Sequence, residues 1–92
     1  MNEIIISVDE NLKVIAGNPY GREISKKCLD GNFDFSKINI LIFPENVRIV
    51  CSSFFQGLFS KLLEIYTPEQ LDSVLEIRPS RLEKNLKQGL YE

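Results

Sequence analysis

Histidine and tryptophan are absent from this 92-residue chain, and cysteine occurs only twice. Histidine is the most frequent general base and the most frequent transition-metal ligand, so its absence excludes every catalytic triad that uses imidazole and argues against a hydrolase. The cysteines, Cys28 and Cys51, are far apart and form no Cys-x-x-Cys pair, so neither a zinc site nor a redox motif is predicted. These absences favour a protein that is not an enzyme and that needs no metal and no cofactor.

The chain also lacks a long apolar run and a large excess of one charge. No window approaches the ~20 consecutive apolar residues that a membrane-spanning helix requires. The first residues, MNEIIISVDE, carry an acidic side chain where a signal peptide needs positive charge, so a cytoplasmic protein is expected. The formal net charge of −2 provides no overall attraction for nucleic acid or for an anionic membrane. Nucleic acid and an anionic membrane are therefore disfavoured as partners.

The residues that are present have the composition of a folded domain. Hydrophobic residues make up 43% of the chain and charged residues 26%, which is ordinary for a globular protein and far from the composition of disordered segments. A chain of this length can bury one modest core, so residues 1–92 are predicted to form a single domain. No internal repeat or linker is visible in the sequence.

The N-terminal part predicts two strands and a helix. Residues 3–8 and 12–16 are rich in β-branched side chains and are separated by the turn residues DEN, which predicts an N-terminal hairpin. A helix is expected to begin at Asn18, a good N-cap that is followed by Pro19, and to end before Gly31.

The middle of the chain predicts a central strand and a long helix. INILIF and NVRIV lie on either side of Pro44, Glu45 and Asn46, which indicates one strand region with a bulge or a tight bend. The segment that follows, as far as Tyr66, has the apolar periodicity of one amphipathic helix that packs on the sheet. Its apolar half consists of Phe54, Phe55, Leu58, Phe59, Leu62, Leu63, Ile65 and Tyr66.

The C-terminal part contains two further helix starts. Thr67 with Gln70, and Ser80 with Glu83, have the spacing of capping boxes, and the strand VLEIR lies between them. The last helix is expected to bury Leu82, Leu86 and Leu90. The alternation of strands and helices predicts an α/β domain with a mixed sheet of about four strands, right-handed crossovers and helices mainly on one face.

Small residues with reactive side chains occupy the joint between the central strand and the long helix: Cys51, Ser52 and Ser53. A serine at a helix start can cap free N–H groups, and the positive end of the helix dipole favours an added phosphate. Ser52 and Ser53 are therefore consistent with a simple cap and with a phospho-regulated contact point. A nucleophilic Cys51 is a hypothesis from the enzyme class, because a thiolate at a helix start is activated, but no base accompanies it and a buried structural cysteine is the alternative.

Gly57 lies on the polar side of the predicted helix, where glycine costs ~1 kcal/mol relative to alanine if the position is exposed. Close packing against the first helix and close approach of a partner would each explain its presence. Together with Ser60 and Lys61, it forms the predicted partner-binding surface.

The middle of the chain resembles bacterial STAS-like domains, which are relatives of the anti-sigma-factor antagonists. The segments that carry the resemblance are, in order, the strand NVRIV, the joint CSSFF, the helix QGLFSKLLEIY and the segment TPEQL. The similarity spans roughly residues 17–77, and its specific part is the Ser-Ser-Phe joint with the helix sequence Gly-Leu-Phe-Ser-Lys-Leu. In the antagonists the joint reads Asp-Ser-Ser-Gly, and a partner kinase phosphorylates the second serine, which switches binding off. The resemblance places that serine at Ser53, with Cys51 in place of the aspartate and Phe54 in place of the glycine.

We therefore predict a small STAS-like α/β domain that acts without catalysis, through contact with another protein such as a kinase or a regulatory partner. The alternative is a small stand-alone inhibitor, for example one encoded by a mobile element, that blocks a larger protein complex by covering part of its surface.

Overall fold

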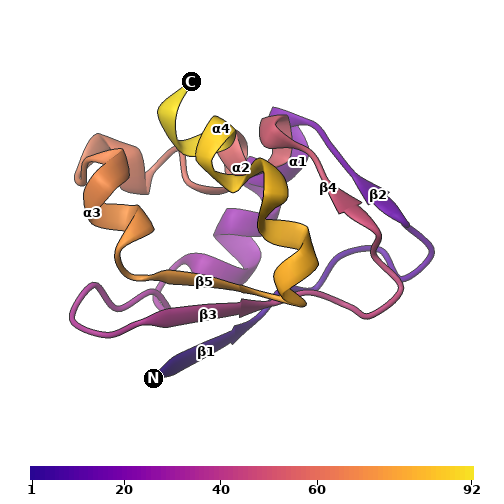
Figure 1. The fold of residues 1–92 in the computed structure, drawn as a ribbon, viewed down its shortest axis with the longest axis horizontal. Coiled ribbons are helices and arrows are strands. Elements are labelled where there is room, and N and C mark those ends of the chain that lie inside the picture. The colour runs from indigo at the N-terminus through magenta and orange to yellow at the C-terminus, as the bar shows by residue number, and fades with distance from the viewer.

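Three short strands lie side by side in a parallel sheet, in the order β1, β3, β5 (Figure 1). In this computed structural model, which describes residues 1–92, β1 is Asn2–Ile5, β3 is Asn39–Ile42 and β5 is Leu75–Arg78. Ile4, in β1, is paired with Leu41, which in turn is paired with Ile77. These side chains are buried on the face of the sheet that carries the core.

Two further strands, β2 (Val14–Ile15) and β4 (Ile49–Val50), form a separate parallel pair. The predicted N-terminal hairpin is therefore wrong, because β1 pairs with β3 and β2 pairs with β4. The single bulged strand is also wrong, since the turn at Pro44 leads the chain from one sheet to the other. The side chain of Asn46 donates to the carbonyls of Glu10 (2.8 Å) and Leu12 (3.2 Å), which joins the two connecting loops.

Successive segments of the chain follow the same path in space. Each begins with a strand of the main sheet, passes a second short element and returns through a helix, and the next segment lies beside the previous one (Figure 1). The sequence shows no repeat, yet the backbone is repetitive. The helical elements are α1 (Asn18–Ile24), η1 (Ser25–Leu29), α2 (Ser52–Leu58), η2 (Leu62–Glu64), α3 (Pro68–Asp72), η3 (Ser80–Asn85) and α4 (Leu86–Tyr91).

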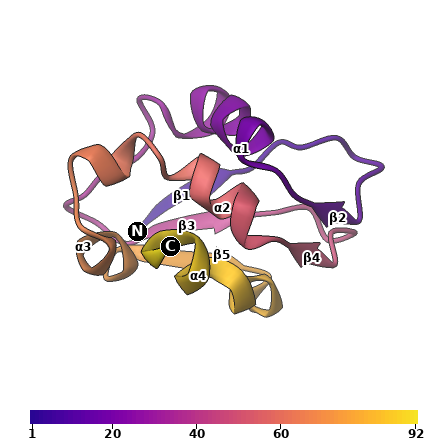
Figure 2. The same cartoon turned by 90° about the horizontal axis from the view of Figure 1, so that it is seen from above.

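All of the α-helices lie on one side of the three-stranded sheet (Figure 1 and Figure 2). The α/β class and the one-sided arrangement of the helices are confirmed. The expectation of one mixed sheet of about four strands is wrong, because every observed pair is parallel and the strands form two sheets. Parallel neighbours are the natural result of a path that returns through a helix after each strand. None of the helices combines the length and the apolarity that crossing a membrane requires.

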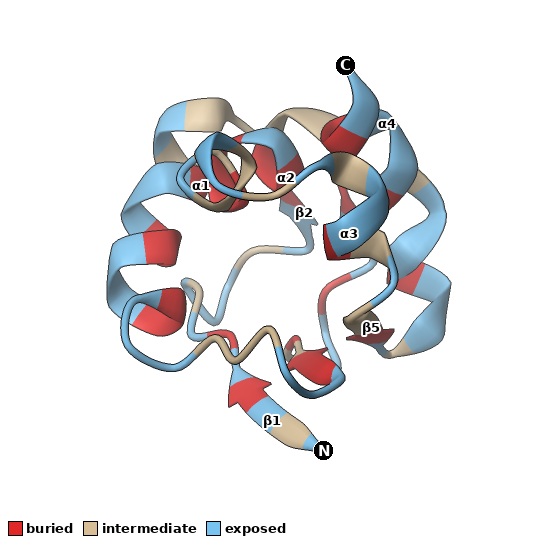
Figure 3. Ribbon diagram, turned by 90° about the vertical axis from the view of Figure 1, so that its left-hand side faces the viewer, coloured by how far each residue is buried: buried red, intermediate tan, exposed pale blue.

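The core lies between the sheet and the helices, and α2 supplies much of it. Phe54, Phe55, Leu58 and Phe59 are fully buried, and the rings of Phe55 and Phe59 stack with centroids 6.2 Å apart. Figure 3 shows buried residues on the inward sides of the helices and exposed residues on the outside. The prediction that this helix anchors the core is confirmed for its first half. The predicted length is wrong, because α2 ends at Leu58.

Glycines set how closely the helices approach one another. A Cβ on Gly57 would collide with the backbone carbonyl of Asn18 in α1, and a Cβ on Gly21 would collide with the carbonyl of Phe54 in α2. Gly89 plays the same part between α4 and α2. Since a collision with backbone cannot be relieved by a side-chain rotation, the packing of α2 between its neighbours requires glycine at these places.

The two predicted capping boxes have different outcomes. Thr67 and Gln70 form the box, with the Gln70 N–H donating to Thr67 Oγ1 (3.1 Å) and the Thr67 N–H donating to Gln70 Oε1 (2.8 Å). The box at Ser80 and Glu83 is wrong, because η3 begins after Pro79 without a side-chain cap. The predicted burial of Leu82, Leu86 and Leu90 is confirmed.

A buried asparagine, Asn39, organises the loop that connects η1 to β3. Its Oδ1 accepts from Asn2 Nδ2 (2.7 Å) and from the Asp34 N–H (2.9 Å), and its Nδ2 donates to the carbonyls of Asp34 (2.8 Å) and Lys37 (3.0 Å). In the same loop, hydrogen bonds from the Ser36 hydroxyl and N–H lower the pKa of the Asp34 carboxyl. This network ties the loop that follows Phe33 to the starts of β1 and β3.

Candidate functional site

Ser53 connects α2 to α1. Its hydroxyl oxygen accepts a hydrogen bond from the N–H of Gly17 (2.9 Å), the residue before α1, whose φ of 101° suits glycine. The predicted cap is wrong for both serines, because Cys51 holds the N-cap position of α2 and no side chain caps the helix. Ser52 is half-buried beside a small hollow of ≈ 210 Å³ that Gln56 also lines.

The three residues of the predicted partner-binding surface differ in their exposure to solvent. Gly57 is buried against α1, so its assignment to a docking face is wrong and close helix packing explains it. Ser60 is half-buried, and its hydroxyl donates to the Gly57 carbonyl at the end of α2 (2.9 Å). Lys61 is exposed, and its Nζ lies 3.5 Å from a carboxylate oxygen of Asp30. Of these candidates, Lys61 alone presents a charged group to solvent.

The cysteines are both free thiols with backbone neighbours. Cys28 is buried, and its Sγ accepts from the N–H of Ser7 (3.4 Å). Cys51 is half-buried, and its N–H donates to the carbonyl of Ile15 (2.8 Å). No group of three or more histidine, cysteine, aspartate or glutamate side chains gathers where it could hold a metal ion.

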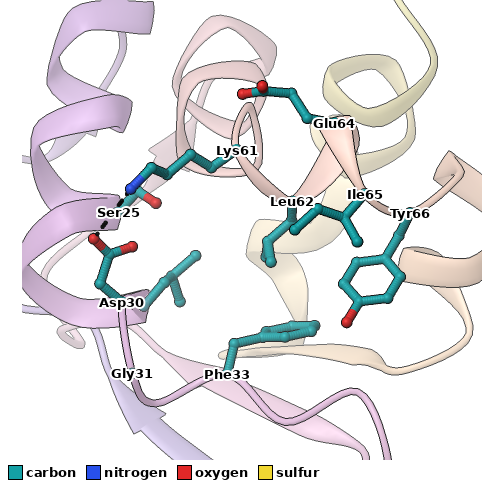
Figure 4. Close-up of a pocket in the computed structure, with 10 residues that line it drawn as sticks. Ser25, Asp30, Gly31, Phe33, Lys61, Leu62, Glu64, Ile65 and Tyr66 are labelled. Carbon is teal, nitrogen blue, oxygen red and sulfur yellow. Dashed lines mark ion pairs between the residues drawn. The ribbon is translucent and has the colours of Figure 1, made fainter.

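An open groove that sequence reasoning missed lies between the end of η1 and the segment after α2 (Figure 4). Its volume is ≈ 430 Å³, within the usual range for binding pockets. We call it the η1–η2 groove. Its apolar lining comes from Leu29, Phe33, Leu62, Ile65 and Tyr66, and its charged lining from Asp30, Lys61 and Glu64.

The two ends of the groove differ in chemistry. The Lys61–Asp30 ion pair spans one end, while Tyr66 lies at the other (Figure 4). The ring of Tyr66 stacks on that of Phe35, with centroids 4.3 Å apart and planes 7° apart. Phe33 and Leu62 project into the hollow from opposite walls (Figure 4). An apolar floor with a charged end suits a ligand that has an apolar group beside a polar one.

The groove exists because the helix predicted to reach Tyr66 stops early. A helix rises about 1.5 Å per residue and a strand about 3.3 Å, so α2, with 7 residues, roughly matches strands of 4 residues. Phe59 leaves helical geometry with φ −101° and ψ 6°, and the chain then turns through η2. Ile65 is left 73% exposed as a result. The sequence contained one signal for this site: a helix as long as the strands ends before Ile65, so this apolar side chain has no sheet to pack on.

A comparison of this chain with protein-family models, curated proteins and solved structures finds no match. The resemblance to STAS-like domains therefore stays a prediction from the sequence.

Proposed function

We propose that this chain is a non-enzymatic regulatory domain of STAS-like architecture that acts by binding another protein, and that it binds its partner in the η1–η2 groove. The observation that carries the groove as the binding site is Ile65, which is 73% exposed. The other apolar residues that line the groove are Leu29, Phe33, Leu62 and Tyr66. Exposed apolar surface beside a hollow and with a polar rim is typical of protein interaction sites.

The charges of the groove specify the chemistry of the partner. Lys61 is already paired with Asp30, whereas Glu64 has no ion-pair partner within the chain. The rim therefore carries one uncompensated negative charge. We expect the partner to insert an aliphatic or aromatic side chain and to place a basic residue next to it.

A serine switch is a separate part of the proposal, and the resemblance of the Ser-Ser-Phe joint is what supports it. Ser53 Oγ is the acceptor for the Gly17 N–H at the junction of α1 and α2. A phosphate on Ser53 would add about −1.5 to −2 charges at that junction. Phosphorylation would therefore alter the hydrogen bond between Gly17 and Ser53 that joins α1 to α2, in addition to the surface charge.

The binding proposal is tested by comparing what three immobilised proteins retain from an extract of the source cell: wild type, Ile65→Lys and the control Ile49→Lys. Ile49 is also exposed, at 49%, but it lies in β4 and lines no part of the groove. We expect a protein that wild type and Ile49→Lys retain and Ile65→Lys loses, with its dissociation constant raised at least about tenfold in calorimetry with the purified pair. The same retained proteins on all three baits would contradict the groove as the binding site.

A further inference from the structure

The outer edge of β1 has no strand neighbour. On its inner side the Ile6 N–H donates to the carbonyl of Ile42 in the direction of β3 (2.8 Å). Because backbone groups alternate in direction along a strand, Glu3 and Ile5 turn their N–H and C=O groups away from β3. The edge therefore presents two unpaired donors and two unpaired acceptors to whatever lies beside it.

A hollow of ≈ 390 Å³ runs along this edge, with β1 as one wall and Lys27, Cys28 and Asn32 on the other. At each end of the hollow a hydrogen bond joins its two walls. At one end Asn2 Nδ2 donates to the Asn32 carbonyl (2.6 Å), and at the other the Ser7 N–H donates to Cys28 Sγ (3.4 Å). The open stretch between these closures holds the unpaired groups of β1.

The two edge strands of the sheet are not protected equally. β5 leads directly into Pro79 and η3, which packs against it. β1 contains no proline, no lysine and no bulge, and its Ile5 is 63% exposed. Natural proteins usually protect edge strands with such features or cover them. η1 packs beside β1, but between the two closures the stretch from Glu3 to Ile5 has neither kind of protection, so a short strand can add there.

The surface beside the hollow is basic. A second hollow, on the outer side of α1 and η1, has Lys27 in common with the first, which Glu3 also lines. Its charged lining consists of Arg22, Glu23, Lys26 and Lys27, which carries an excess of positive charge. A segment with acidic side chains is the electrostatic complement of this surface.

We propose that the open edge of β1 binds an extended, acidic peptide segment of a partner protein as an additional strand. Main-chain hydrogen bonds to Glu3 and Ile5 supply the pairing, and Lys26 and Lys27 select for negative charge. This surface is separate from the η1–η2 groove, and the proposal goes beyond the function proposed above without depending on it.

The probe is a short acetylated and amidated peptide of alternating glutamate and valine, added at millimolar concentration to isotope-labelled full chain. We expect the amide signals of Glu3 and Ile5 to shift in NMR spectra and their hydrogen exchange to slow at least about tenfold. The matched control is the same peptide methylated on every backbone nitrogen, which keeps every charge but leaves no N–H group on either edge and so cannot pair as a strand. It should leave both amides unchanged, and so should a peptide with lysine in place of glutamate.

Protein variants test the same edge from the other side. Because the Ile5 N–H is not used toward β3, Ile5→Pro removes the outer donor without breaking the existing ladder, and it should abolish binding of the probe. Ile5→Thr keeps the donor and should bind the probe, while Lys27→Glu should weaken binding. If Ile5→Pro does not fold, the comparison of the two peptides on the wild-type chain decides the matter.

Three outcomes would overturn the proposal. Equal binding of the methylated peptide would show attraction by charge alone, and signal changes confined to residues 61–66 would place the peptide in the η1–η2 groove. Slow exchange of Glu3 and Ile5 in the free protein, together with a dimer in sedimentation, would show that a second copy occupies the edge. Because the two sites have different reporter residues, failure here is distinguishable from failure of the groove.

Discussion

The segment from Ser52 to Tyr66 has one apolar pattern but two structural outcomes. Its first half, α2, lies between α1 and α4, and Phe54 and Phe55 are fully buried. Its second half, around η2, leaves Ile65 73% exposed beside an open groove. Apolar periodicity therefore specifies which side chains can be buried together, whereas the neighbouring elements decide whether those side chains become buried.

The largest expected effect concerns the buried half. Phe59→Ala removes a fully buried ring that stacks on Phe55, and the cavity should lower the free energy of unfolding by ~3–5 kcal/mol. Urea denaturation followed by circular dichroism measures this loss. A loss below ~1 kcal/mol would mean that Phe59 is not part of the packed half.

Gly57→Ala tests whether α1 and α2 approach as closely as the structure shows. The new Cβ meets the backbone carbonyl of Asn18, so overpacking should lower stability by ~1–3 kcal/mol or more, although alanine favours helix formation. Gln56→Ala, at an exposed position of the same helix, is the control. It removes only the exposed hydrogen bond from Gln56 Nε2 to the Glu92 carbonyl (2.8 Å) and should change stability by less than ~0.5 kcal/mol. A Gly57→Ala protein as stable as wild type would mean that the helices lie further apart.

Ser53→Ala removes the acceptor of the Gly17 N–H, and the loss should be roughly 0.5–1.5 kcal/mol, the usual net value of one hydrogen bond, because this bond is only partly buried at the junction of α1 and α2. The neighbouring Ser52→Ala is the control. With no side-chain cap at α2 to lose, it should cost less than ~0.5 kcal/mol. Equal losses for both serines in thermal unfolding would contradict a specific role of Ser53.

The smallest effect on stability is expected in the exposed half. Ile65→Ala should change the free energy of unfolding by less than ~0.5 kcal/mol, because the side chain is mostly in solvent in the folded state as well. Chemical denaturation checks this value, and binding of a groove partner to the same variant should still weaken. A loss of stability as large as that of Phe59→Ala would place Ile65 in the core and remove the basis of the groove.

Local features were predictable where one short segment contains all of the interacting groups. The capping box of Thr67 and Gln70 and the buried face of Leu82, Leu86 and Leu90 are of this kind. The same reasoning failed at Ser80 and Glu83, where the chain adopts 3-10 geometry after Pro79. The spacing of a motif is necessary for a cap, but the backbone geometry that follows it is set by packing.

The candidate site was predictable only in part. Lys61 was identified as an exposed candidate, but Gly57 was misplaced because a glycine on the polar side of a helix looks the same whether it meets solvent or another helix. The η1–η2 groove joins residues 25–33 with residues 61–66, and no pattern in either segment reveals that they meet.

Composition and spacing alone predict an α/β domain with the phenylalanines of α2 in its core, and they exclude histidine-based chemistry. These properties depend on composition and on periodicity within single segments. The pairing of β1 with β3 and of β2 with β4, by contrast, is visible only in the folded chain. The same holds for the repeated path of the backbone, for the η1–η2 groove and for the unpaired edge of β1. The reason is that strand pairing and helix contact join residues distant in the sequence, and equally apolar strands can satisfy their hydrogen bonds in several pairings until the whole core is packed.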